Sequence, residues 1–196
     1  MGLVLSGHCI VYPTSTQPAL GCIPNSLSLD RLFAIKNRPS RFPVSLGVVD
    51  LDQARELVEV PEDVPAILAA FPEGSLTIIL RARKTMDSRL GGANVAIRVV
   101  SHPIAKEFLR MTGPLTATSA NPSGDTPLHD CDSAARLLST SKRPVGSITG
   151  MCVGGAPSTL IAWHTVCGAL ESSNIEVVRE GKVSSEDVLT WWKRRI

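Results

Sequence analysis

Short runs of apolar residues alternate along the chain with segments whose apolar residues recur every three or four positions. The short runs are typical of buried strands, and the longer spacing is typical of amphipathic helices. The predicted strands are 9–12, 44–49, 76–81, 95–99, 115–118, 145–149, 159–163 and 175–179. The predicted helices are 28–36, 52–58, 62–71, 103–111, 133–138 and 185–194. This order predicts an α/β protein with a largely mixed sheet packed by helices.

Local signals set several of these boundaries. Ser28 carries the hydroxyl of an N-cap residue and comes just before the apolar spacing of the first helix. Pro61 introduces the helix 62–71. Because proline cannot continue a helix, we expect the first helix to begin at Ser28 and to end before Pro39.

The composition indicates a single domain spanning residues 1–196. Hydrophobic residues make up 43% of the chain, which is enough for a sizeable core, and no linker or repeat divides the sequence. Aromatic residues make up only 4%, so aliphatic side chains must build the core, as in sheets covered by helices. The net charge of +2 gives no broad positive field for sequence-independent binding of nucleic acid.

The cysteines and histidines show no metal or disulfide pattern. The cysteines form no Cys-x-x-Cys pair and are odd in number, and the histidines lack metal-ligand spacing. We interpret all nine as structural or incidental: Cys9, Cys22, Cys131, Cys152, Cys167, His8, His102, His129 and His164. With no secretory signal or membrane-spanning stretch in the sequence, we expect a cytoplasmic protein without membrane contact.

The segment Leu115 to Gly124 places small hydrogen-bonding groups after an apolar run. We expect these groups at the carboxyl end of a strand, the edge of an open α/β sheet where ligands usually bind. Its candidate ligand contacts are Thr118, Ser119, Asn121 and Ser123. A turn that satisfies only its own backbone explains the same residues equally well.

Three further features carry charge or hydroxyls. Lys36 and Arg38 leave a helix that Pro39 ends, and such a pair suits a polyphosphate, although two cations completing a helix terminus explain it as well. The segment 12–16 brings three hydroxyls to the end of the first strand, where they can orient a substrate or cap a turn. Arg98 interrupts an apolar strand and needs an anionic partner, either a ligand or a structural carboxylate.

The carboxyl terminus, residues 191–196, combines two tryptophans with three cations. Such a patch can bind RNA weakly, and it can equally be the solvated last turn of a helix. Both interpretations stay open at this stage.

Six blocks, in one order along the chain, resemble the YrdC/TsaC family of threonylcarbamoyl-AMP synthases. The blocks are Tyr12-Pro13-Thr14, Lys36-x-Arg38-Pro39, Ala96-Ile97-Arg98-Val99, Thr118-Ser119-Ala120-Asn121-x-Ser123-Gly124, Pro157-Ser158-Thr159 and Arg179-x-Gly181. The resemblance runs from about residue 7 to 181. It implies a YrdC-like twisted mixed sheet with helices around a concave, positively lined cavity.

The resemblance also implies an activity and its partners. The family joins L-threonine, bicarbonate and ATP into threonylcarbamoyl-AMP with release of pyrophosphate, and a downstream tRNA-modifying complex transfers the group to N6 of adenosine 37. We therefore expect Mg²⁺ to accompany ATP, and no metal site formed by the protein itself. By the same resemblance Lys36 and Arg38 are the catalytic cations. ATP would contact Lys36, Arg38, Thr118, Ser119, Asn121 and Arg179, and threonine would contact Thr14, Thr16, Arg98 and Ser119.

The chain departs from the family pattern after Thr14. An acid, an aromatic residue and a glycine of the pattern are replaced here by Ser15, Pro18 and Ala19. Since the aromatic residue would form a wall of the amino-acid pocket, these changes bear on amino-acid specificity. Three alternatives stay open: an RNA-binding or ribosome-maturation module of the same fold, a carbamoyl-phosphate-using enzyme, and a nucleotide-binding homologue with altered specificity.

Overall fold

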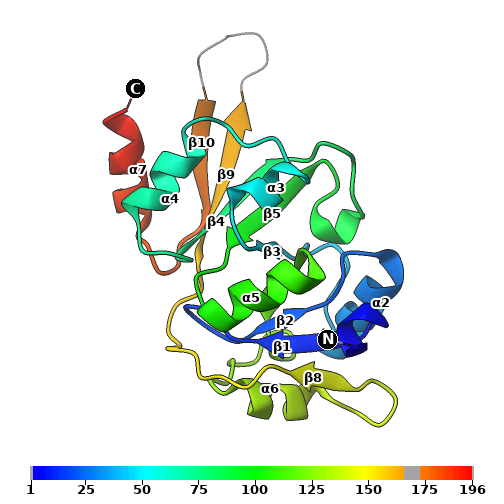
Figure 1. Cartoon of the computed structure of the whole chain (residues 1–196). Coiled ribbons are helices and arrows are strands. Elements are labelled where there is room, and N and C mark those ends of the chain that lie inside the picture. The colour runs from blue at the N-terminus through cyan, green and yellow to red at the C-terminus, as the bar shows by residue number, and fades with distance from the viewer. Residues whose placement is uncertain (1, 166–172, 196) are drawn as a thin grey trace.

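Two mixed sheets organise the fold, where the sequence predicted one (Figure 1). The computed structural model describes residues 2–165 and 173–195. The four-stranded sheet has the order β7 (Thr118–Ser119), β2 (Ala19–Gly21), β1 (Cys9–Tyr12) and β8 (Val145–Ser147). The six-stranded sheet has the order β10 (Ser173–Arg179), β9 (Thr159–Thr165), β4 (Leu76–Arg81), β5 (Asn94–Val99), β3 (Leu46–Val48) and β6 (Leu115–Thr116). Each sheet contains both parallel and antiparallel pairs, as predicted.

Helices pack against both sheets. They are α1 (Gly2–Leu5), α2 (Ser26–Lys36), α3 (Leu51–Arg55), α4 (Val64–Ala70), α5 (Pro103–Thr112), α6 (Cys131–Leu138) and α7 (Ser185–Lys193), with a 3₁₀ turn η1 (Ser88–Leu90). Figure 1 shows α6 beside β1 and β8, α5 across the middle of the molecule, and α7 alongside β10. Helix α5 packs between the two sheets, because its buried Phe108 belongs to the same core cluster as Tyr12 of β1 and Leu115 of β6.

Three predicted helix starts, those of α2, α4 and α6, were wrong by two residues. Helix α6 begins at Cys131, after its N-cap Asp130, and not at Ser133. Helix α2 begins before Ser28, because Asn25 is its N-cap and the Asn25 side chain accepts a hydrogen bond from the amide of Ser28. Helix α4 begins at Val64, three residues after Pro61, with Pro65 in its first turn. In all three places several residues with capping chemistry are close together, and only the folded backbone selects among them.

The predicted strand 115–118 is divided between the two sheets. Strand β6 pairs with β3 in one sheet, and β7 pairs with β2 in the other. Ala117 lies between them and exchanges two hydrogen bonds with Ser45: its amide donates to the Ser45 carbonyl at 2.8 Å, and the Ser45 hydroxyl donates to its carbonyl at 2.9 Å. This segment joins the sheets covalently.

Tyr12 joins the same two sheets through its side chain. The Tyr12 ring is fully buried, and its hydroxyl donates to the Thr116 carbonyl at 3.0 Å. Glycines make room for the ring: a Cβ added at Gly21 or Gly47 would lie 2.6 or 2.7 Å from Tyr12 atoms. The tyrosine of the first sequence block is thus a packing residue beneath the site.

The carboxyl-terminal aromatic residues pack into the core. Trp192 is buried and meets Trp163 edge to face, with ring centroids 5.2 Å apart. Trp191 packs against the same core, and the nearby Arg195 pairs with Asp63 at 3.1 Å. A packed helix end therefore accounts for both tryptophans. None of the helices that the structure describes has the length and apolar character needed to cross a membrane.

Candidate active site between the two sheets

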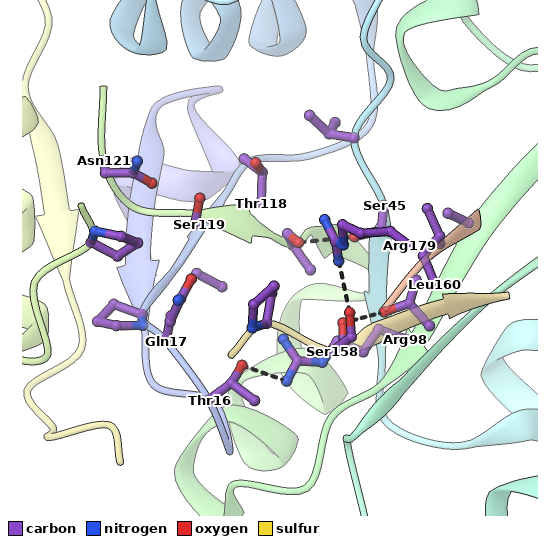
Figure 2. Close-up of a pocket in the computed structure, with 18 of the residues that line it drawn as sticks. Thr16, Gln17, Ser45, Arg98, Thr118, Ser119, Asn121, Ser158, Leu160 and Arg179 are labelled. Atoms are coloured by element: carbon purple, nitrogen blue, oxygen red, sulfur yellow. Dashed lines mark hydrogen bonds between the residues drawn. The ribbon is translucent and has the colours of Figure 1, made fainter. Parts of the chain in front are cut away.

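A cavity of about 350 Å³ lies between the sheets and takes its walls from both (Figure 2). In the six-stranded sheet, alternate positions face it, including Ala96 and Arg98 of β5 and Leu160 of β9. The other walls carry Thr16, Gln17, Thr118, Ser119 and Asn121. Figure 2 shows Thr118, Ser119 and Asn121 along one side of the cavity, across from Arg98 and Arg179. The volume is within the range of small-molecule sites.

A β-bulge turns Arg179 toward the cavity. The register between β10 and β9 shifts between Val177 and Arg179, so that Arg179 pairs with Leu160, a cavity residue. Paired residues lie on the same face of a sheet, and an inserted residue reverses the facing of the residues after it. The Arg179 guanidinium then donates to the Ser158 carbonyl at 2.8 Å.

Arg98 is buried without a carboxylate partner in the described part of the chain. Only 7% of the residue is exposed. Its guanidinium donates to the Gly74 carbonyl at 2.9 Å, the Thr16 hydroxyl at 2.9 Å and the Ser15 hydroxyl at 3.2 Å. Burial lowers the pKa of Arg98, yet arginine keeps its charge in proteins. The neutral partners hold the guanidinium in place but leave its charge uncompensated, which favours an anionic ligand.

Among the described residues, three guanidinium groups and one carboxylate line the cavity. The cations are Arg38, Arg98 and Arg179, and the acid is Asp125. Desolvation is the main cause that lowers the pKa of each arginine, and repulsion from Arg179 lowers the pKa of Arg38 and Arg98 further. Arg38 is held by hydrogen bonds to the Phe42 and Pro43 carbonyls at 2.8 and 3.1 Å. Mutually repelling cations that are already fixed in place can stabilise a polyanion without reorganising.

Lys36 does not line the cavity. The residue is 1% exposed, and its ammonium donates to the backbone carbonyls of Ser119 and Asn121 at 2.5 and 2.6 Å. Burial lowers the pKa of Lys36 to about 8, with a smaller contribution from the charge of Arg38. The predicted pair therefore separates: Arg38 faces the cavity, and Lys36 lies behind the wall that carries Ser119 and Asn121.

Of the predicted hydroxyl and amide contacts, some line the cavity and one lies behind its wall. Thr16, Thr118, Ser119 and Asn121 line the cavity. The Asn121 side-chain nitrogen donates to the Pro122 and Asp125 carbonyls, whereas its buried side-chain oxygen has no hydrogen-bond partner. Thr14 is buried behind Thr16, where its hydroxyl donates to the Gln17 carbonyl at 2.7 Å. Thr14 therefore supports the segment instead of facing the cavity.

Sequence reasoning assigned no role to several residues of the wall. Thr77 and Ser158 face the cavity, and their hydroxyl oxygens lie 2.7 Å apart. Ser45 and Gln17 line it as well. Ser158 lies in the fifth sequence block, so the signal was present, but the block does not indicate which way the Ser158 hydroxyl points.

The described residues contain no group of three or more His, Cys, Asp or Glu side chains that could hold a metal ion. The one carboxylate in the cavity wall, Asp125, does not form a cation site by itself. Any Mg²⁺ in this cavity would therefore depend mainly on the ligand's own oxygens.

The match to a family model decides where the protein belongs. The Sua5_yciO_yrdC model, described as "Telomere recombination", matches residues 3–181. The chain belongs to the Sua5/YciO/YrdC family. A relative from Mycobacterium tuberculosis named "Putative threonylcarbamoyl-AMP synthase" is 29% identical over 192 residues, which cover 96% of this chain and 85% of that protein.

Solved members of the Sua5/YciO/YrdC family share the fold. P. abyssi Sua5, solved in complex with L-threonine, is 25% identical with a TM-score of 0.81, and the match covers 96% of this chain and 55% of that one. E. coli YciO is 27% identical with a TM-score of 0.75, covering 95% of this chain and 89% of that one. The fold predicted from the sequence blocks is thus confirmed, whereas the roles of individual site residues stay predictions.

Proposed function

We propose that this member of the Sua5/YciO/YrdC family is a threonylcarbamoyl-AMP synthase that uses L-threonine, bicarbonate and ATP for tRNA modification. The observation that carries the proposal is the buried Arg98, whose charge lacks a carboxylate partner among the described residues, in a cavity with two further arginines. A carboxylate and a triphosphate are the two anions of this substrate set. The names of the curated relatives and the threonine bound to P. abyssi Sua5 support the same activity.

The chemistry needs fixed positive charge more than a nucleophilic side chain. The threonine amine takes up carbon dioxide from bicarbonate to form an N-carboxylate. One of its oxygens then attacks the α-phosphorus of ATP, and the bond to the β-phosphate oxygen breaks as pyrophosphate leaves. Charge accumulates on the phosphoryl oxygens and on the leaving group, so positioned cations supply most of the rate.

The residues divide between the two substrates by their place in the cavity. We assign the threonine carboxylate to Arg98 and the phosphates to Arg38 and Arg179. Thr16 orients the Arg98 guanidinium through their 2.9 Å hydrogen bond. The amide oxygen of Asn121, which lacks a donor, is available to an N–H or O–H group of the substrates. ATP would bring its Mg²⁺ as part of the substrate, and the reaction would take place in the cytosol.

The deciding experiment incubates the purified protein with ATP, threonine and bicarbonate. We expect threonine-dependent pyrophosphate release and a threonylcarbamoyl adenylate detectable by mass spectrometry. A matched reaction with Arg98→Met tests whether turnover depends on the cavity. Absence of product from folded wild-type protein would overturn the proposal.

A panel of amino acids in the same assay tests the substrate itself. Pro18 lines the cavity in place of the family's aromatic residue, so the preference for threonine over serine, valine and allothreonine is the informative quantity. Turnover with another amino acid only would favour a homologue of altered specificity. Salt-dependent RNA binding without turnover would favour the RNA-binding module.

A further inference from the structure

A smaller cavity, of about 270 Å³, lies at the start of strand β1 and carries three cationic side chains. They are Arg31 of helix α2 and the neighbours Lys142 and Arg143, which come shortly before β8. None of the described residues that line this cavity also lines the cavity between the sheets. Figure 1 shows α2 beside the start of the chain, at one end of the four-stranded sheet. The three cations therefore form a site of their own.

Strand pairing brings two distant segments together at this cavity. Strands β1 and β8 are parallel, and Cys9 lies opposite Val145. Because parallel strands run in the same direction, residues 142–144 enter β8 beside His8, the residue that precedes β1. His8 and Cys9 on one side and residues 142–144 on the other line the cavity together.

A tight turn fixes the backbone of Lys142 and Arg143. The Thr140 amide donates to the Arg143 carbonyl, and the Arg143 amide donates to the Thr140 carbonyl, both at 3.1 Å. The Arg143 amide also donates to the Thr140 hydroxyl at 3.1 Å. On the other side of the turn, the Val145 amide donates to the Ser139 hydroxyl at 3.2 Å. The two cations are thus carried by backbone that is already ordered, which lowers the entropy cost of binding a ligand.

Arg31 is held at the opposite wall of the cavity. Its guanidinium donates to the Ser6 carbonyl at 3.1 Å. Gly7 leaves room for it, since a Cβ there would lie 3.0 Å from a guanidinium nitrogen, and φ of Gly7 is +81°. The described residues take one of the five N–H groups of Arg31, and the others are available to a ligand.

The charge of this cavity is uncompensated. Within residues 2–165 and 173–195, no carboxylate pairs with Arg31, Lys142 or Arg143, and none lines the cavity. Three like charges around one small space repel each other, and an anion bound between them removes this repulsion. The chain as a whole has a net charge of only +2, so this positive field is local.

We propose that this cavity binds a phosphate or diphosphate group. The guanidinium forks of Arg31 and Arg143 match pairs of phosphate oxygens, and the Lys142 ammonium supplies a mobile point charge. A phosphate dianion or a diphosphate compensates more of the three charges than a carboxylate does. The volume of about 270 Å³ lies just below the range of about 300–1,000 Å³ that drug-sized ligands occupy, which suits a small anion. A free phosphate compound and a nucleic-acid backbone both present this group.

Amide chemical shifts in NMR spectra locate the site. The arginines between the sheets also attract pyrophosphate, so binding must be followed residue by residue. Titration of the labelled protein with pyrophosphate should shift the amides of His8, Cys9, Arg31 and Arg143, and acetate at the same pH and ionic strength should not. Shifts confined to the cavity between the sheets, or equal shifts with acetate, would overturn the proposal.

Substitution of the exposed cations tests their role. Lys142→Ala/Arg143→Ala should raise the Kd for pyrophosphate, followed at the Arg31 amide, about tenfold or more, because two charge-assisted hydrogen bonds are lost. Arg83→Ala/Lys84→Ala is the matched control, since it removes an exposed pair of neighbouring cations outside both cavities. An unchanged Kd in the first variant, or an equal rise in the control, would refute the site.

Arg31→Gln tests the opposite wall of the cavity. It should raise the same Kd, followed at the Arg143 amide, about tenfold, because a neutral amide replaces the guanidinium fork. Unchanged affinity in this variant would exclude Arg31 from the site.

A short single-stranded RNA in the same titration identifies the source of the phosphate group. Shifts at Arg31 and Arg143 that pyrophosphate reverses would assign the site to a nucleic-acid backbone, whereas shifts with pyrophosphate alone would assign it to a free phosphate compound. Both results support a phosphate site. The proposal does not rest on the proposed function, because binding is measured without ATP, threonine or turnover.

Discussion

The Lys36 ammonium lies 2.6 Å from the backbone oxygen of Asn121 and ties the end of helix α2 to the cavity wall. A second hydrogen bond reaches the Ser119 carbonyl, so one side chain fixes both residues at the end of β7. Lys36 thus acts as a positioning residue for the hydroxyl and amide contacts of the cavity. The charge that faces the cavity comes instead from the three arginines.

Lys36→Met should destabilise the protein by about 1–3 kcal/mol, because two buried carbonyls lose their donor. Urea unfolding measures the change, and Arg38→Met is the matched control because the Arg38 guanidinium is closer to solvent. Equal stabilities of wild type and Lys36→Met would contradict the role of Lys36 in the wall.

The stability contributed by Lys36 should rise with pH. Its pKa is about 8 in the folded protein, chiefly through burial, against 10.5 for the ordinary side chain. Between these values the unfolded chain binds more protons, so the free energy of unfolding increases with pH. At about 1.4 kcal/mol per pKa unit the full gain is about 3 kcal/mol. Urea unfolding at about pH 7.5 and 9.5 should show wild type gaining relative to Lys36→Met; a constant difference would exclude the effect.

Arg98→Lys should raise the KM for threonine about 10–100-fold while leaving the KM for ATP nearly unchanged. The guanidinium reaches the Gly74 carbonyl and two hydroxyls at once, which one ammonium cannot reproduce. Steady-state pyrophosphate release measures both constants. Arg110→Lys, on the exposed side of α5, is the control for an arginine-to-lysine substitution away from the cavity. Parallel rises in both KM values would remove the assignment of Arg98 to the carboxylate.

Arg179→Gln should raise the melting temperature of the ligand-free protein and weaken ATP binding. Repulsion between Arg179 and the other two arginines lowers their pKa values, and the substitution removes it. Thermal unfolding with and without ATP separates the two effects, because the stabilisation by ATP should shrink. Lys182→Gln changes a nearby cation outside the cavity wall, so it should alter neither the melting temperature nor the stabilisation by ATP. A lower melting temperature in Arg179→Gln would contradict a destabilising repulsion between Arg179 and the other two arginines.

Gly74→Ala should reduce stability and raise the KM for threonine. Gly74 has φ +71°, and an added Cβ would lie 2.6 Å from the Ser15 hydroxyl and 2.9 Å from that of Ser101. Its carbonyl accepts two hydrogen bonds from Arg98, so a shift there moves the guanidinium. Gly92→Ala is the matched control, since φ is +65° and nothing lies within 4 Å. Gly92→Ala should lose only the stability of about 1–2 kcal/mol that a left-handed backbone costs a residue other than glycine. A similar rise in the KM for threonine in both variants would contradict the role of Gly74 in holding Arg98.

The parts of the fold with a strong local pattern were predictable. Helix α5 begins at Pro103 and strand β4 spans 76–81, as expected, because proline and an unbroken apolar run determine them locally. Strands β2 and β7 are too short to show periodicity. Their pairing depends on residues that are a hundred positions away in the sequence, which no local pattern records.

The site residues likewise divide into those with a local sequence signal and those placed by distant parts of the chain. Arg98 stood out because a cation inside an apolar strand is anomalous, and it is indeed buried with its charge toward the cavity. The inward turn of Lys36 depends on two carbonyls more than eighty residues away. Arg179 reaches the cavity through a one-residue bulge that alternation of apolar residues does not reveal.

The passage of residues 115–119 from one sheet to the other has a mechanical consequence. Strand β6 is anchored beside β3 and strand β7 beside β2, with only Ala117 between them. A ligand that draws Ser119 toward Arg98 therefore pulls on the backbone of both sheets at once. Strain applied at β7 therefore reaches the edge strand of the six-stranded sheet along the main chain, over the length of a single residue.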